Sequence, residues 1–187
     1  MHVLDLAENS LAAGARRLEI RVTEDPLEDR LTLEVADDGC GMSEQVRERA
    51  RDPFFTTRTT RKVGLGLSLL EQAAQAAGGE LRLESQAGAG TTVTAVFQLS
   101  HPDRQPLGDM AATLLTLAAG HPDVEISFEH RRGEALARFS TAELRRQTPG
   151  LRLNSPTGIA ALRRKLEESL RPIESCGHGE TYGLGDR

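Results

Sequence analysis

The sequence predicts an α/β two-layer sandwich, an α+β arrangement in which a mixed, mostly antiparallel sheet carries helices on one face. Two observations lead to this expectation. Four segments alternate apolar and polar residues, so each exposes one polar face as a strand. Apolar residues at helical spacing occur before and between these segments, and such stripes need a sheet face that buries them.

The composition narrows the possible classes of function. The chain has 187 residues, of which 38% are hydrophobic and 27% charged, as in ordinary globular proteins. A net charge of -5 argues against nucleic acid as the main ligand. No apolar run reaches the roughly 20 residues that a membrane span needs. Cys40 and Cys176 are too few for a disulfide framework, and no signal sequence is recognisable, so a cytoplasmic location is expected.

The first half begins with a helix and a strand pair. Apolar residues recur at helical spacing over residues 4–15. The alternating segments 18–22 and 31–35 are separated by an acidic, Pro-containing connection, which is typical of a hairpin. A short helix is expected near Ser43, whose side chain can cap its first turn.

A second helix and strand pair follow. An apolar stripe starts at Gly66 and ends at Gly78 and Gly79, which are typical of a helix C-terminus. Segments 80–85 and 91–99 then alternate again, and the glycines between them suit a tight hairpin. These elements complete the expected sandwich over residues 1–100.

The character of the chain changes at residues 100–109, where Pro and Asp are frequent and a linker is expected. A small C-terminal α+β unit is predicted over residues 101–172, followed by a disordered tail over 173–187. Within the unit we expect helices and strands at the following positions: a helix at 107–119, strands at 123–130 and 134–139, and a helix at 156–171.

Several short polar motifs have ordinary explanations when each is taken alone. Asn9 on a helix is commonly solvent-facing, "DDGCG" (37–41) suits a turn, "DPFFTTR" (52–58) contains core phenylalanines, and "GLGL" (64–67) opens a helix. Their order along the chain, ending in "GAGTT" (88–92), is distinctive. With "DLAENS" (5–10) as an N box, residues 3–99 closely resemble the Bergerat ATP-binding fold of DNA gyrase, chaperone ATPases, histidine kinases and MutL.

The resemblance, strongest to the histidine-kinase branch, implies ATP and Mg²⁺ as cofactors. It implies that Asn9 supplies a carbonyl oxygen, a hard ligand suited to Mg²⁺, and that Asp37 accepts a hydrogen bond from the adenine amine. Asp5 and Asn9 are the implied catalytic residues. The implied ATP-binding residues are Asn9, Asp37, Gly39, Gly41, Met42, Phe54, Thr57, Arg58, Lys62, Gly64, Leu65, Gly66, Leu67 and Thr91.

The segment between the two glycine motifs is expected to be a lid. Phe54 and Phe55 would anchor it, while Arg58, Arg61 and Lys62 offset phosphate charge, and ATP would order it. After it, backbone N–H groups at the start of the next helix would approach the phosphates.

Two positions depart from the family pattern. Asp5 stands four residues before Asn9, where the chaperone and MutL branches usually carry the Glu that activates water. A shorter Asp leaves hydrolysis an open question, and Glu8, about 100° round the helix from Asn9, is a second choice. Lys62 and Val63 stand where histidine kinases often have Gly-Thr.

Three functions remain open at this point. The first is a kinase, a transferase in signal transduction that passes the γ-phosphoryl group of ATP to a partner protein. The acceptor His is then expected on another chain, or there is none. The second is a nucleotide-gated binding module or slow ATPase. The third is a Ser/Thr kinase of the anti-sigma-factor kind. The partner itself is not identifiable from the sequence.

Overall fold

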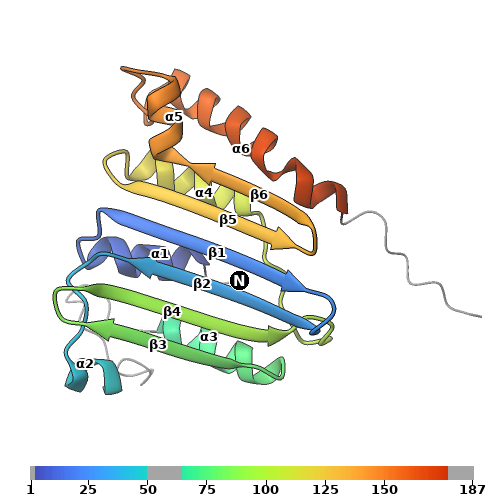
Figure 1. Ribbon diagram of the computed structural model, residues 1–187. Helices are drawn as coiled ribbons and strands as arrows, with labels where there is room; N and C mark the ends of the chain where they lie inside the picture. The colour runs from blue at the N-terminus through green and yellow to red at the C-terminus, as the bar shows by residue number, and fades with distance from the viewer. Residues whose placement is uncertain (1–2, 50–64, 177–187) are drawn as a thin grey trace, which may run out of the picture.

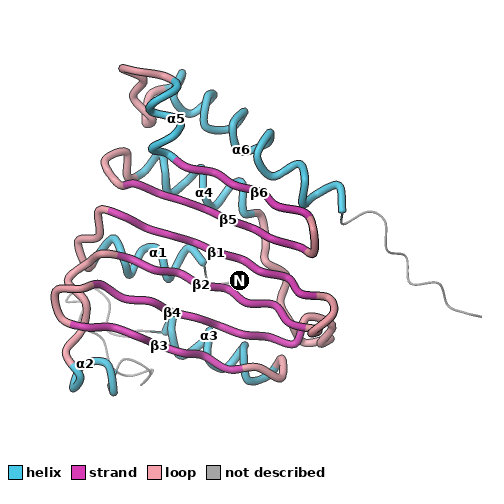
Figure 2. The backbone as a smooth tube through the Cα atoms, viewed as in Figure 1, coloured by secondary structure: helices cyan, strands magenta, loops and turns pink. Residues whose placement is uncertain are grey.

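The computed structural model describes residues 3–49 and 65–176, which form a single six-stranded sheet with helices packed on it (Figures 1 and 2). The strand order across the sheet is β3-β4-β2-β1-β5-β6. The strands are β1 (Arg17–Asp25), β2 (Arg30–Asp37), β3 (Glu80–Gln86), β4 (Gly90–Gln98), β5 (Glu125–Arg132) and β6 (Ala135–Ser140).

One face of this sheet is covered by helices. The helices are α1 (Val3–Ala12), α2 (Glu44–Arg49), α3 (Leu65–Ala76), α4 (Met110–Gly120), α5 (Thr141–Gln147) and α6 (Pro156–Cys176). Figure 1 shows α1, α3 and α4 behind the sheet, while α6 runs beside β6 and packs against β6 and α4. The predicted two-layer arrangement with a mixed sheet is therefore confirmed.

Strand alternation explains which side chains reach the helices. In β1, Leu18, Ile20 and Val22 are almost fully buried, while the residues between them face outward. Strands β1 and β2 pair antiparallel, as do β2 with β4 and β3 with β4. Both hairpins expected from the first half of the chain are therefore confirmed.

The C-terminal segment extends the same sheet. Strand β5 pairs parallel with β1, which makes the sheet mixed, and β6 pairs antiparallel with β5. One continuous hydrophobic core includes Ile20 of β1, Leu114 of α4, Phe128 of β5 and Leu166 of α6. The expected division near residue 100 falls in the connection between β4 and α4, and the independence of the two parts as folding units remains a proposal.

Two expectations for this segment need correction. Residues 173–176 are helical, because Ile173 extends the buried stripe of Leu162, Leu166 and Leu170, so the predicted tail is wrong at its start. Residues 177–187 lie outside the described residues. Helix α5 was not expected from the sequence. Ser140 caps it by accepting a hydrogen bond from the Glu143 backbone N–H, at 3.3 Å.

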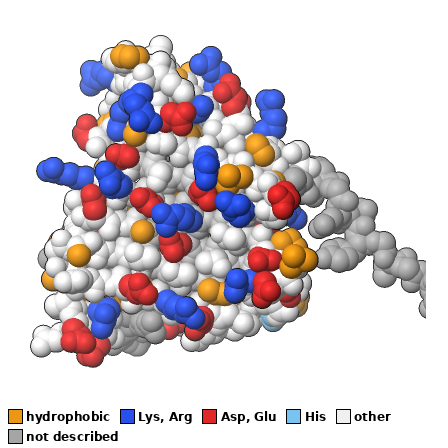
Figure 3. Space-filling view, in the orientation of Figure 1, with side chains coloured by type: hydrophobic (Ala, Val, Ile, Leu, Met, Phe, Trp, Pro, Cys, Tyr) orange, Lys and Arg blue, Asp and Glu red, His pale blue; other side chains and the backbone are white. Residues whose placement is uncertain are grey.

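The uncovered face of the sheet is polar and carries both signs of charge (Figure 3). Arg21 of β1 pairs with Glu34 of β2 at 2.5 Å, and Arg138 of β6 pairs with Glu129 of β5 at 2.9 Å. Such exposed pairs contribute little stability and suit a solvated face. In residues 3–49 and 65–176, no helix combines the length and apolarity required to cross a bilayer.

Candidate functional site

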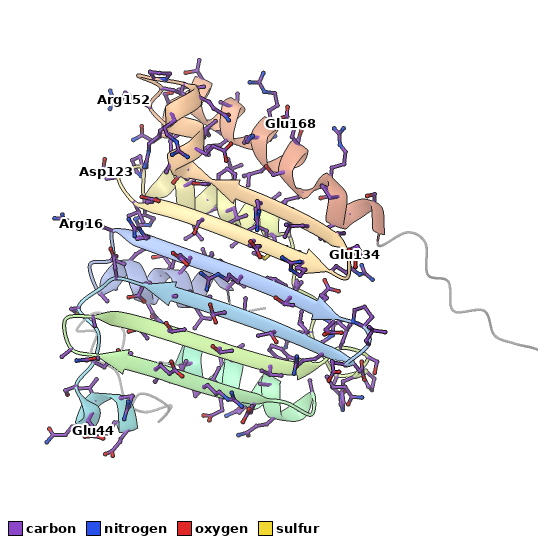
Figure 4. All side chains as sticks on the ribbon, in the orientation of Figure 1. Arg16, Glu44, Asp123, Glu134, Arg152 and Glu168 are labelled. Atoms are coloured by element: carbon purple, nitrogen blue, oxygen red, sulfur yellow. The ribbon has the colours of Figure 1, made fainter. Side chains whose placement is uncertain are left out.

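Three neighbouring strands bring polar side chains together at one end of the helix-covered face. Asp37 of β2 is paired with Thr91 of β4, and Thr91 is paired in turn with Ser85 of β3. Directly opposite residues in antiparallel strands point to the same face, so the three side chains form a row. We call Asp37, Thr91 and Ser85 the polar row. Figure 4 labels Arg16 and Glu44 at this end of the molecule and Glu134 at the opposite end.

The carboxylate of Asp37 is held by two donors. One oxygen accepts a hydrogen bond from the backbone N–H of Gly39 at 2.9 Å, and the other accepts one from the Ser10 hydroxyl at 2.6 Å. Ser10 lies on the buried stripe of α1 and is 5% exposed, while Asp37 is half-buried. The two bonds fix the orientation of the carboxylate and leave lone pairs for a further donor.

At the other end of the polar row, Ser85 connects two loops. Its hydroxyl accepts a hydrogen bond from the backbone N–H of Met42 at 2.9 Å. It also lies 2.9 Å from the carbonyl oxygen of Gly90 and 2.9 Å from the hydroxyl of Thr91. The loop after β2 is thereby joined to the hairpin between β3 and β4.

Two glycines permit this close approach of backbones. Gly41 has φ +62°, and a Cβ atom there would lie 1.9 Å from the carbonyl oxygen of Gln86. Gly90 has φ +96°, and its Cβ would lie 1.9 Å from the carbonyl oxygen of Asp37. Both distances are impossible for a side-chain carbon, so the loop geometry requires glycine at both positions.

Helices α1 and α3 meet beside the polar row. A Cβ atom on Gly66, the second residue of α3, would lie 3.4 Å from Asp5 Cβ and 3.7 Å from Asn9 Nδ2. Asp5 and Asn9 are exposed, whereas Leu67 is 8% exposed and packs in the core. The first turn of α3, where backbone N–H groups lack helical partners, therefore adjoins the Asp5 and Asn9 side chains.

Glu8 faces a different neighbour. Its carboxylate lies 3.7 Å from Nε2 of His121, at the C-terminal end of α4. Of the two acidic residues weighed as catalytic candidates, Asp5 is thus the one that adjoins Gly66, while Glu8 contacts α4.

The carboxylate of Asp38, unlike that of Asp37, is bound to the backbone at the start of β1. Its carboxylate accepts hydrogen bonds from the backbone N–H groups of Arg17 at 2.8 Å and Arg16 at 2.7 Å. The bond from Arg17, aided by that from Arg16, holds the pKa of the Asp38 carboxyl below its usual range. Asp38 therefore fixes the start of β1 against the end of β2.

Part of the predicted site falls outside the described residues. This holds for Phe54, Phe55, Thr57, Arg58, Arg61, Lys62 and Gly64, and with them for the expected lid. Leu65 begins α3, but its side chain is not described. The residues that the structure does bring to one end of the molecule are Asp5, Asn9, Asp37, Gly39, Gly41, Met42, Gly66 and Thr91. Leu67 follows Gly66 in α3, but its side chain packs in the core.

The donor set around α1 suits a magnesium ion that keeps most of its water. Among the described residues, no three His, Cys, Asp or Glu side chains gather in a way that could hold a metal ion. Mg²⁺ bound with a nucleotide commonly uses one or two protein oxygens plus phosphate oxygens and water. The side chain of Asn9, whose amide nitrogen lies near Gly66 in the first turn of α3, includes one such carbonyl oxygen.

Sequence reasoning missed Ser10 and Ser85. Ser10 follows Asn9 and lies on the same helix stripe as the buried residues Leu6 and Val3. Ser85 occupies the inward position that follows Leu81 and Leu83 in β3. In both cases the sequence places a polar residue at a position that the apolar pattern of its helix or strand predicts to be buried. That mismatch could have identified the two serines.

Comparisons with known proteins agree with this arrangement. Residues 2–101 match the family model described as histidine kinase-, DNA gyrase B-, and HSP90-like ATPase. The chain therefore belongs to this family of ATPases.

The curated relatives are much longer than this chain. Histidine protein kinase DivJ of Caulobacter vibrioides is 40% identical over 96 residues, covering 49% of this chain and 16% of that protein. Signal transduction histidine-protein kinase AtoS of Escherichia coli is 30% identical over 104 residues, covering 55% of this chain and 17% of that protein. The chain thus spans about a sixth of the length of these two relatives.

A solved structure extends the likeness in fold to the C-terminal segment. The crystal structure of the N-terminal domain of a DNA repair protein matches 90% of this chain and 55% of its own, with a TM-score of 0.52 and 20% identity. At that identity the match shows a shared fold alone.

Proposed function

We propose that this protein binds ATP with Mg²⁺ at the polar row and transfers the γ-phosphoryl group to a partner protein in signal transduction. Membership of the ATPase family and the histidine kinase relatives support ATP as the nucleotide. The expected cytoplasmic location is part of the same proposal.

One observation carries the proposal: consecutive residues of α1 serve two parts of one site. Ser10 donates to Asp37 at the polar row, and Asn9 adjoins Gly66 at the start of α3. A nucleotide has a base that needs directional hydrogen bonds and a phosphate chain that needs N–H donors and a cation. Asp37 would take the base, while Asn9 and α3 would take the metal and phosphates.

The chain's own groups suit phosphoryl transfer, which depends mainly on positioning and charge neutralisation. The N–H groups of the first turn of α3 would orient the phosphates, and a Mg²⁺ ion held by Asn9 would offset their charge. Asp5 would lie beside the same turn, within reach of a nucleophile that approaches the terminal phosphate. We propose that the positive charges of Arg58 and Lys62 offset the remaining negative charge of the phosphates.

Incubation of the purified protein with γ-³²P-labelled ATP, Mg²⁺ and a native cell extract tests this function. Label on an extract protein is the expected result, and its loss in the Asn9→Ala variant would tie the transfer to this site. An Asn154→Ala variant, changed at an exposed residue between α5 and α6, is the matched control and should transfer label normally. Release of free phosphate without labelled protein would contradict the kinase proposal and indicate an ATPase.

A second candidate function is favoured by the sheet itself. Strand β1, which follows the site helix α1, pairs along its length with β5 of the C-terminal segment. Glu8 of α1 also contacts His121 at the end of α4. Nucleotide binding at α1 would thus bias the C-terminal segment, as a nucleotide-gated binding module requires. Retention of unhydrolysed ATP, with no labelled protein in the extract, would favour this alternative.

A further inference from the structure

The hydroxyl of Ser85 has three neighbours but a single proton. It accepts from the Met42 backbone N–H, and it lies 2.9 Å from both the Gly90 carbonyl oxygen and the Thr91 hydroxyl. A hydroxyl supplies one donor and two acceptor lone pairs, so the protons in this group are countable.

One arrangement makes all three contacts hydrogen bonds. The carbonyl oxygen of Gly90 can only accept, so the Ser85 proton must be directed to it. One Ser85 lone pair accepts from Met42, and the second is then available to accept from Thr91. Thr91 therefore donates its own proton to Ser85, and its lone pairs are what it can offer to a ligand.

This direction of the Thr91 hydroxyl has a consequence for recognition of a base. Thr91 is paired with Asp37 across β2 and β4, on the helix-covered face. An ionised carboxylate is also an acceptor without a proton. The polar row thus presents two neighbouring acceptors, which complement an exocyclic amine with two N–H donors and oppose a ring carbonyl.

We propose that Ser85 is a positioning residue that makes the nucleotide site selective for a 6-amino purine over a 6-oxo purine, by fixing the proton of Thr91. This inference rests on the proposed function, because it specifies how the same site selects its base. Ser85 acts through Thr91 and the Met42 loop. Without Ser85, the Thr91 hydroxyl can rotate and donate to a carbonyl.

Calorimetric titration of the full chain with Mg-ATP and with Mg-ITP, its 6-oxo counterpart, tests the inference. The wild type should prefer ATP, and Ser85→Ala should lower the ratio of the two affinities about tenfold, as expected for one redirected hydrogen bond. Ser85→Thr retains the hydroxyl and should keep the ratio within about threefold of the wild type. Ser127→Ala changes a serine of β5 outside the polar row and is the matched control, which should leave the ratio of the two affinities unchanged.

A double-variant cycle distinguishes this role from a purely structural one. In a Thr91→Val background the hydroxyl that Ser85 orients is absent, so Ser85→Ala should no longer change the ratio. Equal weakening of ATP and ITP binding by Ser85→Ala would overturn the inference, as would a wild type that binds both equally. Those results would leave the proposed function standing. A wild type that binds neither nucleotide would instead overturn the proposed function, and this inference with it.

Discussion

The two ends of the helix-covered sheet face both carry polar side chains, but the carboxylates there have different neighbours. At the site end, Asp37 is held by a hydroxyl and a backbone N–H, both neutral donors. At the other end, Glu24 of β1 lies 2.8 Å from His130 of β5 and 3.5 Å from Arg132. A carboxylate whose partners are neutral donors has no counter-charge beside it and can accept a further hydrogen bond from a ligand. A carboxylate between basic groups is already paired, and its removal leaves those groups without a partner.

The Glu24–His130 pair also lies where the family-matched part of the chain meets the C-terminal segment. Val22 is paired with His130 in the parallel register, and Glu24 is the next inward residue of β1. His130 is 5% exposed, and its ring meets the Phe128 ring edge to face, with centroids 6.2 Å apart. We therefore distinguish the proposed binding end from the opposite end, here called the structural end, and variants at the two ends should change different measured quantities.

The largest expected effect is on nucleotide binding at the site end. Asn9→Ala removes the proposed Mg²⁺ ligand and should weaken Mg-ATP binding about a hundredfold, or ~2.7 kcal/mol. Because Asn9 is exposed, the free energy of unfolding should change by less than about 0.5 kcal/mol. Titration calorimetry and urea unfolding measure the two quantities. Normal Mg-ATP affinity in this variant would show that the metal assignment is wrong.

At the structural end, Glu24→Gln should show the reverse pattern. It leaves His130 and Arg132 without their anionic partner and should lower the free energy of unfolding by about 2 kcal/mol. ATP affinity should stay within about twofold of the wild type, because Glu24 lies at the far end of β1. Glu28→Gln, in the exposed turn after β1, is the control that should leave both quantities unchanged. A large loss of ATP affinity in Glu24→Gln would contradict the separation of the two ends.

Two adjacent aspartates at the site end, Asp37 and Asp38, should affect different quantities. Asp37→Asn exchanges a charged acceptor for a neutral one and should weaken ATP binding about tenfold. Asp38→Asn should lower stability by about 1 kcal/mol without changing ATP affinity, because its carboxylate binds the backbone N–H groups of Arg16 and Arg17. Titration calorimetry measures the ATP affinity of both variants. An equal loss of ATP affinity in the two would contradict the proposed role of Asp37 in binding the base.

The pH dependence of stability should also reflect the Glu24 carboxylate, with a modest effect. Burial raises the pKa of Glu24, but hydrogen bonding to His130 and the positive charges of His130, Arg132 and Arg104 outweigh it, so the pKa is lowered. A lowered carboxyl pKa stabilises the fold above the unfolded value, here 4.5, and this contribution is lost as the pH falls through the folded value.

Urea unfolding between about pH 7 and pH 3 measures this contribution. The stability difference between wild type and Glu24→Gln should narrow over the acid part of that range. The pKa values of Asp29 and Asp38 are also lowered, so the wild type and Glu24→Gln should both lose stability as the pH falls, by the same amount from these two residues. A difference that stays constant down to pH 3 would show that ionisation of Glu24 does not matter.

The sequence predicted the first four strands and their helices well, since each had a clear period and glycine-rich turns. It did not predict that β5 would add to β1 in parallel, because pairing partners distant in the chain leave no local pattern. Helix α5 did have a local sequence signal, because Ser140 and Glu143 have capping-box spacing before Leu144. The helix is too short to show a repeating apolar stripe.

The candidate site was predictable through its motifs but incompletely through its supports. Asp37 and the glycines stand in recognisable short segments, whereas Ser10 and Ser85 have meaning only once α1, β2, β3 and β4 are adjacent. A serine between apolar residues gives no indication of which carboxylate or hydroxyl it will contact. Supporting residues of this kind depend on tertiary contacts.

Hydrogen exchange of the backbone amides, with and without Mg-ATP, tests the placement of the nucleotide most directly. We expect ATP to slow exchange at residues 37–42 and in the first turn of α3, with smaller effects at residues 125–140 of β5 and β6. Unchanged exchange at residues 37–42 under saturating Mg-ATP, or protection confined to β5 and β6, would contradict the account.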